Sequence, residues 1–472
     1  MRCGLEAYKS KRPVYSRVVS KKAKNQELQK TAVFFFRMHW RSLGVPACEL
    51  RLAHTLPTGQ AFGWRPVSVS EWEGAIGDAA VALREAPETF EAEWRCASNR
   101  EAEVLERLRD YFQLSTPLKP LYEQWIAADR EGRLPMVAEA LPGVRVLRQD
   151  PGECLMSFIC SSNNNIGRIT LMLNRLKMEL PEILELPGSA EPVYAFPSLE
   201  KIATLPEERL RDLGFGYRAP YVVETAKAVV DNDINLLDLR REKSRSDVKA
   251  LLCKNFKGVG PKVADCVALF SLDFTDAVPV DTHVWRLARR DYDATGTLKN
   301  LQASGLTPKI CDEVGDSFRT TFGSHAGWAH SLLFAAELPA FADKLPPSLR
   351  ESMQDFRDNE KRENKDAKLR KKQIQDEKHL TKLSLNQDEL LEELSSLSGE
   401  DETEPSSQQP TNKTTPLLKR SRTKTTTTPA TTTDHHHTGG SSRPVAIVGV
   451  STTTTSSRPS SSRRKTKKDY SS

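Results

Sequence analysis

Two different spacings of apolar residues divide this chain into a strand-forming part and a helix-forming part. The strand-forming part consists of short runs separated by turn residues: Cys48–Leu56, Gln60–Arg65, Ala79–Arg84 and Phe90–Cys96. In the last run, Phe90, Ala92, Trp94 and Cys96 alternate with charged residues, which is typical of a half-buried strand. We therefore predict an antiparallel sheet with one face against a core.

A helical spacing begins at Glu101, where Val104, Leu108 and Tyr111 fall on one face. It continues to about residue 340 and is interrupted by segments that contain Gly and Pro. A sheet followed by many helices predicts the α+β class. We expect an N-terminal antiparallel β-sheet domain at 46–145, packed on a mostly helical body at 146–340.

Both ends of the chain differ from this core in composition. Residues 1–45 carry 11 Lys and Arg against 2 Asp and Glu, and are predicted to extend outside the fold; a mitochondrial leader is the alternative. Residues 341–400 are dominated by charged side chains and are predicted to form an exposed helix. Residues 401–472 hold Ser, Thr and Pro tracts with basic clusters, which predicts a disordered tail.

Composition also argues against several classes of protein. No window approaches 18 uncharged apolar residues, so we expect no membrane-spanning segment and no membrane partner. The 8 cysteines are scattered without a Cys-x-x-Cys pair. This pattern argues against a disulfide scaffold, a four-cysteine zinc site and an iron–sulfur cluster. We expect no metal site and no cofactor.

The segment 256–270 carries the strongest indication of chemistry. Its Lys257-Gly258-Val259-Gly260-Pro261 stretch lies between two apolar helical runs. Two glycines around one apolar residue allow a tight hairpin, and the free amides at the start of the second helix can bind a phosphate oxygen. Pro261 suits the first position of that helix. The alternative for such a turn is a plain connector between helices.

Two side chains near the hairpin suggest catalysis. Lys262 lies close to a positive helix end and to Lys257, and both influences disfavour its protonated form. A neutral amine can attack carbon. Asp281 follows an apolar run and precedes another helix, so we predict that it is an N-cap. Taken singly, a phosphate-binding Lys262 and a merely capping Asp281 remain the alternatives.

Together these residues resemble a known family. The hairpin with Lys262, followed by the segment 278–283, resembles the helix-hairpin-helix DNA glycosylases, and the lysine resembles their bifunctional branch. Four further blocks resemble the eukaryotic 8-oxoguanine DNA glycosylases: Leu56–Gln60 with Phe62 and Trp64, Cys154–Arg168, Leu213–Ala219, and Gly327–Ala329 with Phe334. The resemblance covers about 46–340. Two related branches, endonuclease III and adenine glycosylase, carry an iron–sulfur loop for which this chain has no cysteine cluster.

The resemblance implies a bifunctional DNA glycosylase and AP lyase of base excision repair, which removes 8-oxoguanine opposite cytosine from duplex DNA. Lys262 would attack the sugar C1′ and form a Schiff base that permits β-elimination, and Asp281 would stabilise positive charge on the sugar. Cys266 and Phe334 would sandwich the flipped base, and the Gly59 carbonyl would sense the proton on N7.

The resemblance also implies contacts to the rest of the duplex. Asn163, Arg168 and Arg218 would hold the cytosine that is left behind, and Tyr217 would wedge into the stack. Further contacts to the DNA backbone would come from Lys257, Gly258, Gly260 and His283.

Two residues depart from the family pattern. His330 stands where the family usually has Gln, whose amide reads the edge of the base. Since imidazole titrates near about 6.5, we expect excision to depend on pH between about 5.5 and 7.5 through His330; the alternative is a ring that packs sideways and does not read the base. Lys257 stands where the family usually has Pro, and we expect it to help DNA binding.

The uneven distribution of charge along the chain bears on its partners and its location. Residues 46–340 carry a net charge of −8, so the DNA interface is expected to be a local basic patch, assisted by the +9 of residues 1–45 and the +7 of residues 401–472. Basic clusters at Lys419–Lys424 and Arg463–Lys468 suit nuclear import, with a mitochondrial form as a second location. We expect a monomer whose partners are the damaged duplex and downstream base excision repair enzymes.

Two other functions use the same fold. The first is a DNA-binding module that has lost its activity, which the presence of Lys262 and Asp281 opposes. The second is an enzyme for alkylated bases that acts through the Asp alone, which Lys262 and the cytosine-contacting residues oppose.

Overall fold

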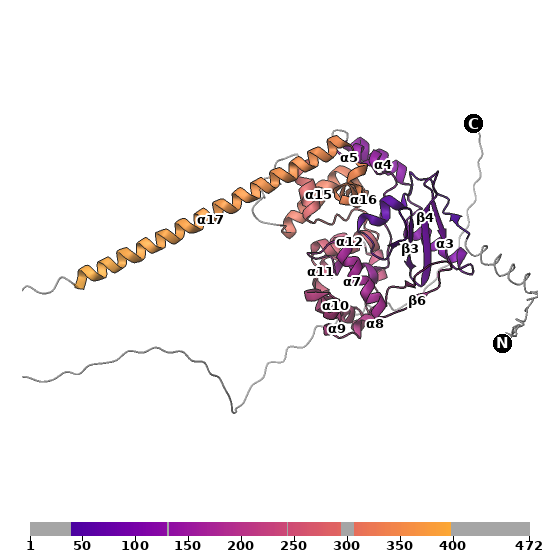
Figure 1. Ribbon diagram of the computed structural model, residues 1–472, viewed down its shortest axis with the longest axis horizontal. Coiled ribbons are helices and arrows are strands. Elements are labelled where there is room, and N and C mark those ends of the chain that lie inside the picture. Colours follow the sequence, from indigo (N-terminus) through magenta and orange to yellow (C-terminus); the bar gives the residue numbers. More distant parts are fainter. Residues whose placement is uncertain (1–38, 130–131, 243, 294–305, 398–472) are drawn as a thin grey trace, which may run out of the picture. The chain divides into compact units, whose positions relative to one another are not determined.

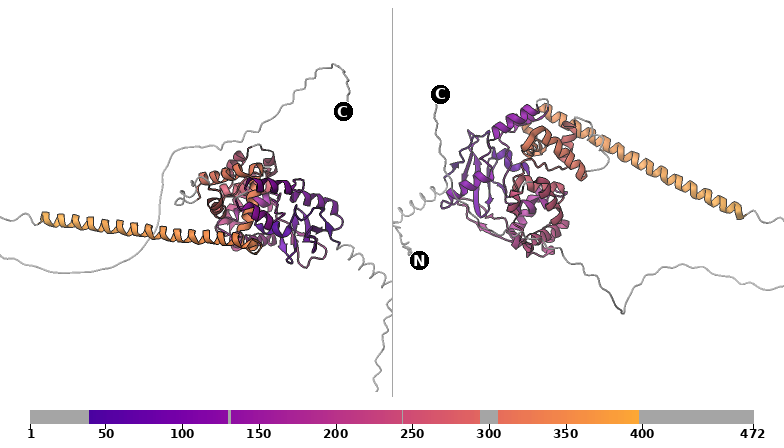
Figure 2. Two further views of the ribbon diagram at one scale, coloured as in Figure 1. Left: turned by 90° about the horizontal axis from the view of Figure 1, so that it is seen from above. Right: turned by 180° about the vertical axis from the view of Figure 1, so that it is seen from behind.

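The computed structural model describes residues 39–129, 132–242, 244–293 and 306–397, and the predicted disordered tail at 401–472 lies outside them (Figure 1). Residues 1–384 form one compact unit and residues 385–472 a second. In the first unit a sheet lies beside a larger helical body, as both views of Figure 2 show. The predicted α+β class and its two parts are therefore confirmed.

Five antiparallel strands form the N-terminal sheet, in the order β1-β5-β4-β3-β2. They are β1 (Arg41–Ser42), β2 (Arg65–Pro66), β3 (Glu71–Ile76), β4 (Ala79–Glu85) and β5 (Ala92–Arg95). Val81 and Leu83 of β4 lie in a core that they share with Val104 and Leu108 of helix α3 (Glu101–Tyr111). The sheet therefore has one face against a helix, as its alternating pattern predicts.

The strand predictions are only partly confirmed. β4 and β5 occupy the predicted runs at 79–84 and 90–96. Phe90, however, is 46% exposed with a φ of 56°, so it belongs to the turn before β5 and not to the inner face. The prediction of a strand over Cys48–Leu56 is wrong, because Leu52–Thr55 forms helix α2. Leu52, His54 and Thr55 are all buried, and burial on every side removes the polar face that marks a helix in the sequence.

Two strands were not anticipated by the alternating pattern. In β3, Glu73 is buried on the face of the sheet opposite to Val81 and Leu83 and accepts a hydrogen bond from Arg65 at 2.6 Å, so a charged residue occupies a buried position. β1 lies inside the segment 1–45, where Arg41 pairs with Trp94 and Ser42 with Glu93. The predicted boundary at 45 is therefore wrong, since a strand of two residues is too short to show a period. Of the run Gln60–Arg65, only Arg65 is in a strand.

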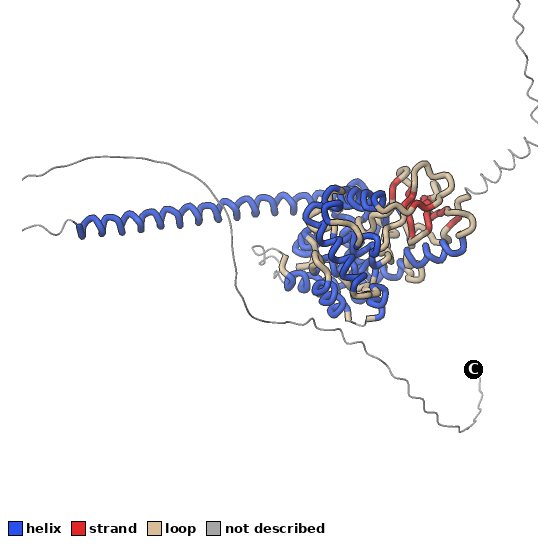
Figure 3. The backbone as a smooth tube through the Cα atoms, turned by 90° about the horizontal axis from the view of Figure 1, so that it is seen from below, coloured by secondary structure: helices blue, strands red, loops and turns tan. Residues whose placement is uncertain are grey.

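Helices make up the rest of the first unit, as the blue segments of Figure 3 show. The further helices are α4 (Leu118–Ala128), α5 (Leu134–Ala140), α6 (Pro151–Ile159), α7 (Ile166–Glu179), α8 (Leu199–Ala203), α9 (Glu207–Asp212), α10 (Ala219–Asp231), α11 (Arg245–Asn255), α12 (Pro261–Ser271), α13 (Thr282–Asp291), α15 (Pro308–Phe322), α16 (Ala326–Glu337) and α17 (Pro347–Leu397). A short ribbon of β6 (Ile183–Leu184) and β7 (Val193–Tyr194) accompanies them.

The core of the helical body is wider than the predicted range 146–340. It includes Leu118 and Trp125 of α4 at one end and Leu349 and Met353 of α17 at the other. Apolar spacing alone does not show which of two cores a helix joins, and this explains the difference. Helix α17 lies within the segment 341–400 for which an exposed helix is predicted, and of its first turns Leu349 and Met353 are buried.

Helix α12 is the centre of this body. Its residues from Val263 to Ser271 are all buried, and it packs against α6, α11 and α15. Gly260 precedes it as the N-cap and Pro261 occupies its first turn, as predicted. Only the N-terminal end of this helix reaches the surface, and there Lys262 is partly exposed.

Candidate active site

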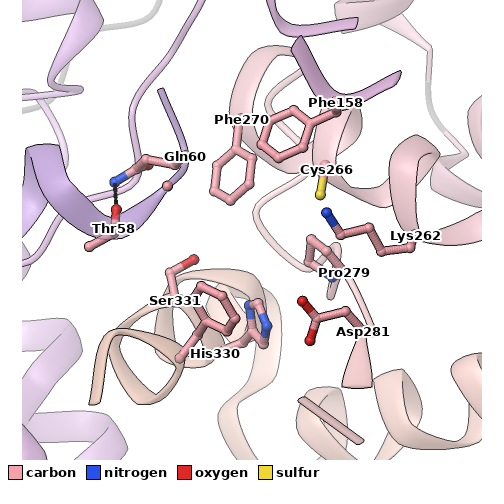
Figure 4. Close-up of a pocket in the computed structure, with 12 residues that line it drawn as sticks. Thr58, Gln60, Phe158, Lys262, Cys266, Phe270, Pro279, Asp281, His330 and Ser331 are labelled. Carbon is pink, nitrogen blue, oxygen red and sulfur yellow. Dashed lines mark hydrogen bonds between the residues drawn. The ribbon is translucent and has the colours of Figure 1, made fainter. Parts of the chain in front are cut away.

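Lys262 emerges from the first turn of α12 into a pocket. The pocket holds about 440 Å³ of empty space, part of which is open to solvent. Figure 4 shows the side chains around it, which come from α6, α12, α16, the loop before α13 and the turn after α2. Its lining comprises Thr58, Gly59, Gln60, Phe158, Lys262, Cys266, Phe270, Pro279, Asp281, His330, Ser331 and Phe334. The predicted catalytic pair and all four predicted base-contacting residues therefore lie in one pocket.

The Lys262 amine has a fixed resting place. Its Nζ donates a hydrogen bond to Ser161 Oγ at 3.1 Å and lies 5.0 Å from the centre of the Phe158 ring. The Ser161 hydroxyl donates its own proton to the Phe158 carbonyl at 2.7 Å, so its lone pairs face the amine. Ser161 was not singled out from the sequence, although it directly follows the buried helix α6 in a block that resembles the family.

Asp281 combines a structural contact with its place in the pocket. Its Oδ1 accepts hydrogen bonds from the backbone amides of His283 at 2.8 Å and Val284 at 3.0 Å, which confirms the predicted N-cap of α13. Two amide donors and the positive end of the helix hold the carboxylate in one orientation. A fixed negative charge is thereby presented to the pocket.

Cys266 lies one turn after Lys262 and is 2% exposed. Burial raises the pKa of its thiol to about 12, although the neighbouring Lys262 opposes this rise. The group is therefore a neutral thiol beside the amine, and it offers a small apolar surface to a flat ligand. Phe158 and Phe270 line the same wall and stack with ring centres 5.4 Å apart.

The aromatic wall opposite is made by α16. Phe334 stacks on His330 with ring centres 6.0 Å apart and planes 27° apart, and the His283 ring meets Phe334 edge-on at 6.1 Å. Cys266 and Phe334 both line the pocket, as their predicted sandwich requires. The sandwich itself stays a prediction.

His330 is buried with both ring nitrogens unpaired within the described part of the chain. Burial lowers the pKa of the imidazole to about 4, although the Asp281 carboxylate opposes this shift. The ring therefore stays neutral at ordinary pH and can offer one donor and one acceptor. The expectation that His330 makes excision depend on pH between about 5.5 and 7.5 assumed an unperturbed imidazole, and a pKa of about 4 does not fit that assumption.

Gly59 ends the turn after α2 in the left-handed region, with a φ of 75°. A β-carbon there would lie 2.7 Å from Ile166 Cδ1, so the Ile166 side chain would have to move, and the left-handed backbone itself disfavours any side chain. The following Gln60 amide fixes the turn, because its Nε2 donates to Thr58 Oγ1 at 3.0 Å and to the Arg145 carbonyl at 2.8 Å. The Gly59 backbone is thus held at the pocket wall.

The hairpin between α11 and α12 adjoins this pocket. Gly258 has a φ of 79°, and a β-carbon there would lie 2.6 Å from the Tyr221 ring. In the part of the chain that the structure describes, the Gly258 and Gly260 amides donate to no other group. Lys257 Nζ bonds Glu224 Oε1 at 2.7 Å, and this contact raises the pKa of the lysine. Glu224 thus offsets the positive charge that we expected to help DNA binding.

A groove connects the hairpin with the pocket. Its lining includes Gly258, Gly260 and His283 together with Lys262 and Asp281. The Nδ1 atom of His283 is buried, with no partner among the described residues. The groove therefore brings the predicted phosphate contacts next to the predicted catalytic pair.

The residues predicted to contact the opposite strand gather at the turn after α6. Asn163 is exposed in the left-handed region, with a φ of 46°, and also lines the groove. Arg168 is exposed on the first turns of α7. Arg218 is only 2% exposed and donates to the carbonyls of Ser162 and Asn163. Its guanidinium is thus bound to backbone, an arrangement that the sequence did not predict.

Tyr217 shares this attachment. Its hydroxyl donates to the Ser162 carbonyl at 2.9 Å, and its ring lies 4.3 Å from the Arg218 guanidinium carbon. The ring is 46% exposed, as a residue that inserts into a base stack must be.

Within residues 39–129, 132–242, 244–293 and 306–397, no group of three His, Cys, Asp or Glu side chains could hold a metal ion. Among those same residues, no helix combines the length and the apolar character that crossing a bilayer requires.

Known proteins resemble the chain over both of its parts. Residues 42–155 match the family model for the 8-oxoguanine DNA glycosylase N-terminal domain. Residues 156–306 match that for the HhH-GPD superfamily of base excision DNA repair proteins. These two segments meet inside α6, the helix that Ser161 follows after the C-cap Cys160.

Among curated proteins, the N-glycosylase/DNA lyase OGG1 of Arabidopsis thaliana is 39% identical over 307 residues, covering 64% of this chain and 81% of that protein. The N-glycosylase/DNA lyase of Saccharomyces cerevisiae is 33% identical over 335 residues, covering 63% of this chain and 85% of that protein. Among solved structures, the Clostridium acetobutylicum 8-oxoguanine glycosylase/lyase, in complex with duplex DNA that contains cytosine opposite 8-oxoguanine, has a TM-score of 0.52 and 28% identity. That match covers 61% of this chain and 92% of the other.

Proposed function

The chain belongs to the 8-oxoguanine DNA glycosylases of the HhH-GPD superfamily, and from this premise we propose how its own residues perform the reaction. As an N-glycosylase/DNA lyase it removes 8-oxoguanine in base excision repair. The observation that carries the residue assignment is that Lys262 and Asp281, from separate elements, line one pocket with Cys266, Phe334 and Gly59.

Lys262 is the nucleophile. As the bond between the base and C1′ breaks, its nitrogen forms a bond to C1′, and the base leaves with the electron pair and takes up a proton. The nitrogen then loses one proton, and the C1′–O4′ bond breaks with its electron pair going to O4′, which takes up a proton. The nitrogen lone pair forms the C=N bond, which gives a protonated Schiff base. Loss of a C2′ proton and departure of the 3′ phosphate complete β-elimination. Asp281 stabilises the positive charge that develops on the sugar, because its two backbone hydrogen bonds keep the carboxylate in place.

The flipped base lies between Cys266 and Phe334. The neutral thiol and the aromatic ring both suit a flat purine, and the Gly59 carbonyl accepts the N7 proton that distinguishes 8-oxoguanine from guanine. His330 faces the base with two unpaired nitrogens. In its neutral form one of them accepts from a donor on the base edge, and the other donates.

Cytosine is the preferred opposite base. Asn163, Arg168 and Arg218 supply the donors that cytosine requires once Arg218 leaves its backbone carbonyls, and Tyr217 fills the gap in the stack. The hairpin amides of Gly258 and Gly260, with His283 and Lys257, bind the backbone phosphates.

Borohydride trapping tests the reaction and the base preference together. The full chain is incubated with duplexes that carry 8-oxoguanine opposite each of the four bases, and with an undamaged duplex as control. We expect a covalent complex with the damaged duplexes, formed fastest opposite cytosine. Absence of any trapped complex contradicts the Schiff base, and equal rates opposite all four bases contradict the assignment of the cytosine contacts.

The basic clusters at Lys419–Lys424 and Arg463–Lys468 further support a nuclear location. A fluorescent fusion of the full chain is expected in the nucleus, and the same fusion ending at residue 400 is expected to lose this preference. A mitochondrial pattern of the full-length fusion would contradict the nuclear assignment.

A further inference from the structure

Helix α17 continues far beyond the part that packs on the body. Its first turns are anchored, because Glu360 bonds Arg286 of α13 at 2.6 Å and Arg357 bonds Glu337 of α16 at 3.0 Å. From Lys361 to Lys382 every side chain is exposed. In Figure 1 the anchored and exposed parts form one uninterrupted helix. The exposed part therefore contributes no apolar burial that would account for its presence.

Charge in this exposed part is separated by face. It carries 9 Lys and Arg against 4 Asp and Glu. With about 100° between successive residues, its seven lysines fall within an arc of about 140°. This lysine face consists of Lys361, Lys365, Lys368, Lys371, Lys372, Lys378 and Lys382. Glu363, Asp366 and Glu377 lie on the opposite side, and Asp376 lies near the border.

Such an arrangement is unfavourable for a helix in water. Like charges three or four residues apart, such as Lys365 with Lys368 and Lys368 with Lys372, repel one another. Lys361 pairs with Asp358 at 2.9 Å, but within the described part of the chain the other six lysines have no carboxylate at ion-pair distance. Helices that only need to be soluble place opposite charges at these spacings. The lysine face is therefore suited to binding an anion outside the chain.

We propose that the lysine face of α17 binds the phosphate backbone of duplex DNA outside the active site. This rests on the proposed function, which gives the body a duplex as its substrate. The face spans about 32 Å along the helix axis, and a duplex carries one negative charge per about 1.7 Å over such a length. The body at 46–340 has a net charge of −8, which opposes the binding of a polyanion, and the lysine face supplies positive charge that compensates for it.

A membrane surface fits this helix less well. Membrane-bound amphipathic helices carry a continuous apolar face opposite their basic face. Here the side opposite the lysines carries Glu363, Asp366 and Glu377. The exposed apolar side chains Leu369, Ile374 and Leu380 form no continuous face, because Ile374 lies about 140° around the helix from Leu369, and Leu380 lies about three turns beyond Leu369.

The test compares two double variants with the same change in net charge. Lys368→Gln with Lys372→Gln removes two charges from the lysine face, whereas Arg362→Gln with Arg370→Gln removes two from other sides of the same helix. Gln has nearly the helix propensity of Lys and Arg, so α17 is preserved, and circular dichroism checks this. The probe is a lesion-free duplex of 30 base pairs, whose binding to the full chain is measured over a range of salt concentrations.

The lysine-face variant is expected to lower the slope of log K against log salt by about 1.8, or about 0.9 for each lost phosphate contact, while the arginine variant leaves it nearly unchanged. Equal loss in both variants would show an effect of net charge alone and overturn the proposal, as would an unchanged slope in the lysine-face variant. Tighter binding to vesicles of phosphatidylserine and phosphatidylcholine than to the duplex would also overturn it.

Excision of 8-oxoguanine by the wild-type chain, measured in a single turnover at saturating enzyme, separates this result from the proposed function. Failure of excision contradicts the proposed function, whereas the lesion-free duplex tests the lysine face in either case. Both double variants are expected to excise at the wild-type rate at saturation, because neither changes the pocket.

Discussion

Ser161 accepts a hydrogen bond from the Lys262 amine at 3.1 Å while it donates its own proton to the Phe158 carbonyl. The nucleophile is thus held by a hydroxyl whose direction is set by the end of α6. A lysine side chain carries about 2 kcal/mol of rotamer freedom, so one fixed acceptor restricts where the amine can lie. Ser161 is a positioning residue in this arrangement.

Replacement of Ser161 tests this role. Ser161→Ala is expected to slow borohydride trapping roughly fivefold at saturating enzyme, since one hydrogen bond contributes about 1 kcal/mol. Ser161→Thr keeps the hydroxyl and is expected to restore the rate. Ser271→Ala is the matched control, because Ser271 also donates to a carbonyl of its own helix but lies at the far end of α12. If Ser161→Ala and Ser271→Ala slow trapping equally, the effect on Lys262 is not specific.

Lys262→Gln is expected to abolish both trapping and base release. Glutamine keeps most of the length of the side chain but has no nucleophilic amine, so binding of lesion-containing duplex should be largely retained. Gel-shift and trapping assays on the same duplex measure the two properties separately. Wild-type levels of trapped complex in this variant would exclude Lys262 as the nucleophile.

The neutral state of His330 has a consequence for stability. In the unfolded chain an imidazole titrates near about 6.5, whereas the folded pKa is about 4. Between these values the unfolded chain binds a proton that the folded chain does not, so the free energy of unfolding falls as pH is lowered from about 6.5 to about 4. The contribution of His330 amounts to about 3 kcal/mol at the acid end.

His330→Gln should remove this contribution. Urea unfolding at pH 7 and pH 5 is expected to show a smaller loss of stability in the variant than in the wild type, and the effect of the other buried imidazole, His54, cancels in the comparison. Excision by the two proteins should vary in the same way between pH 5.5 and 7.5, and the Gln variant should excise at least as fast at neutral pH. A wild-type excision profile with an extra step near pH 6.5 would contradict the buried, neutral ring.

Arg218→Ala is expected to reduce the preference for cytosine more than it weakens binding to undamaged duplex, because base contacts specify where phosphate contacts only position. Since Arg218 is 2% exposed, Arg218→Lys serves as the second variant: it keeps the charge but loses the planar fork. Excision opposite each of the four bases, with melting temperature as the control for folding, provides the measurement. An unchanged preference in two folded variants would remove Arg218 from base recognition.

Local patterns explain why much of the site could be predicted. The hairpin, Pro261 in the first turn of α12 and Asp281 as an N-cap all depend on residues a few positions apart, and the structure has each of them. In contrast, the hydrogen bond between Lys262 and Ser161 joins residues 101 positions apart. The hydrogen bond from Arg218 to the Ser162 carbonyl joins residues 56 positions apart. No periodicity in the sequence reports contacts of this range.

In the sheet, too, the sequence pattern predicts some strands and misses others. β4 and β5 were predictable because their inward residues are apolar. In β3 the charge of Glu73 is buried on the other face of the sheet, where Arg65, Arg95 and Ser189 contact it at 2.6 Å, 3.4 Å and 2.6 Å, so its burial depends on residues elsewhere in the chain. The low pKa of His330 is likewise a property of its burial, which the sequence does not give.

The Ser162 carbonyl accepts hydrogen bonds from both Tyr217 and Arg218. Two donors that share one acceptor are not independent: when one withdraws, the other can bind the oxygen more closely. The free-energy effects of replacing Tyr217 and Arg218 should therefore not add. This shared oxygen couples the wedge to the reader of the opposite base: when one side chain leaves the oxygen to engage the DNA, the other is held more tightly and costs more to release.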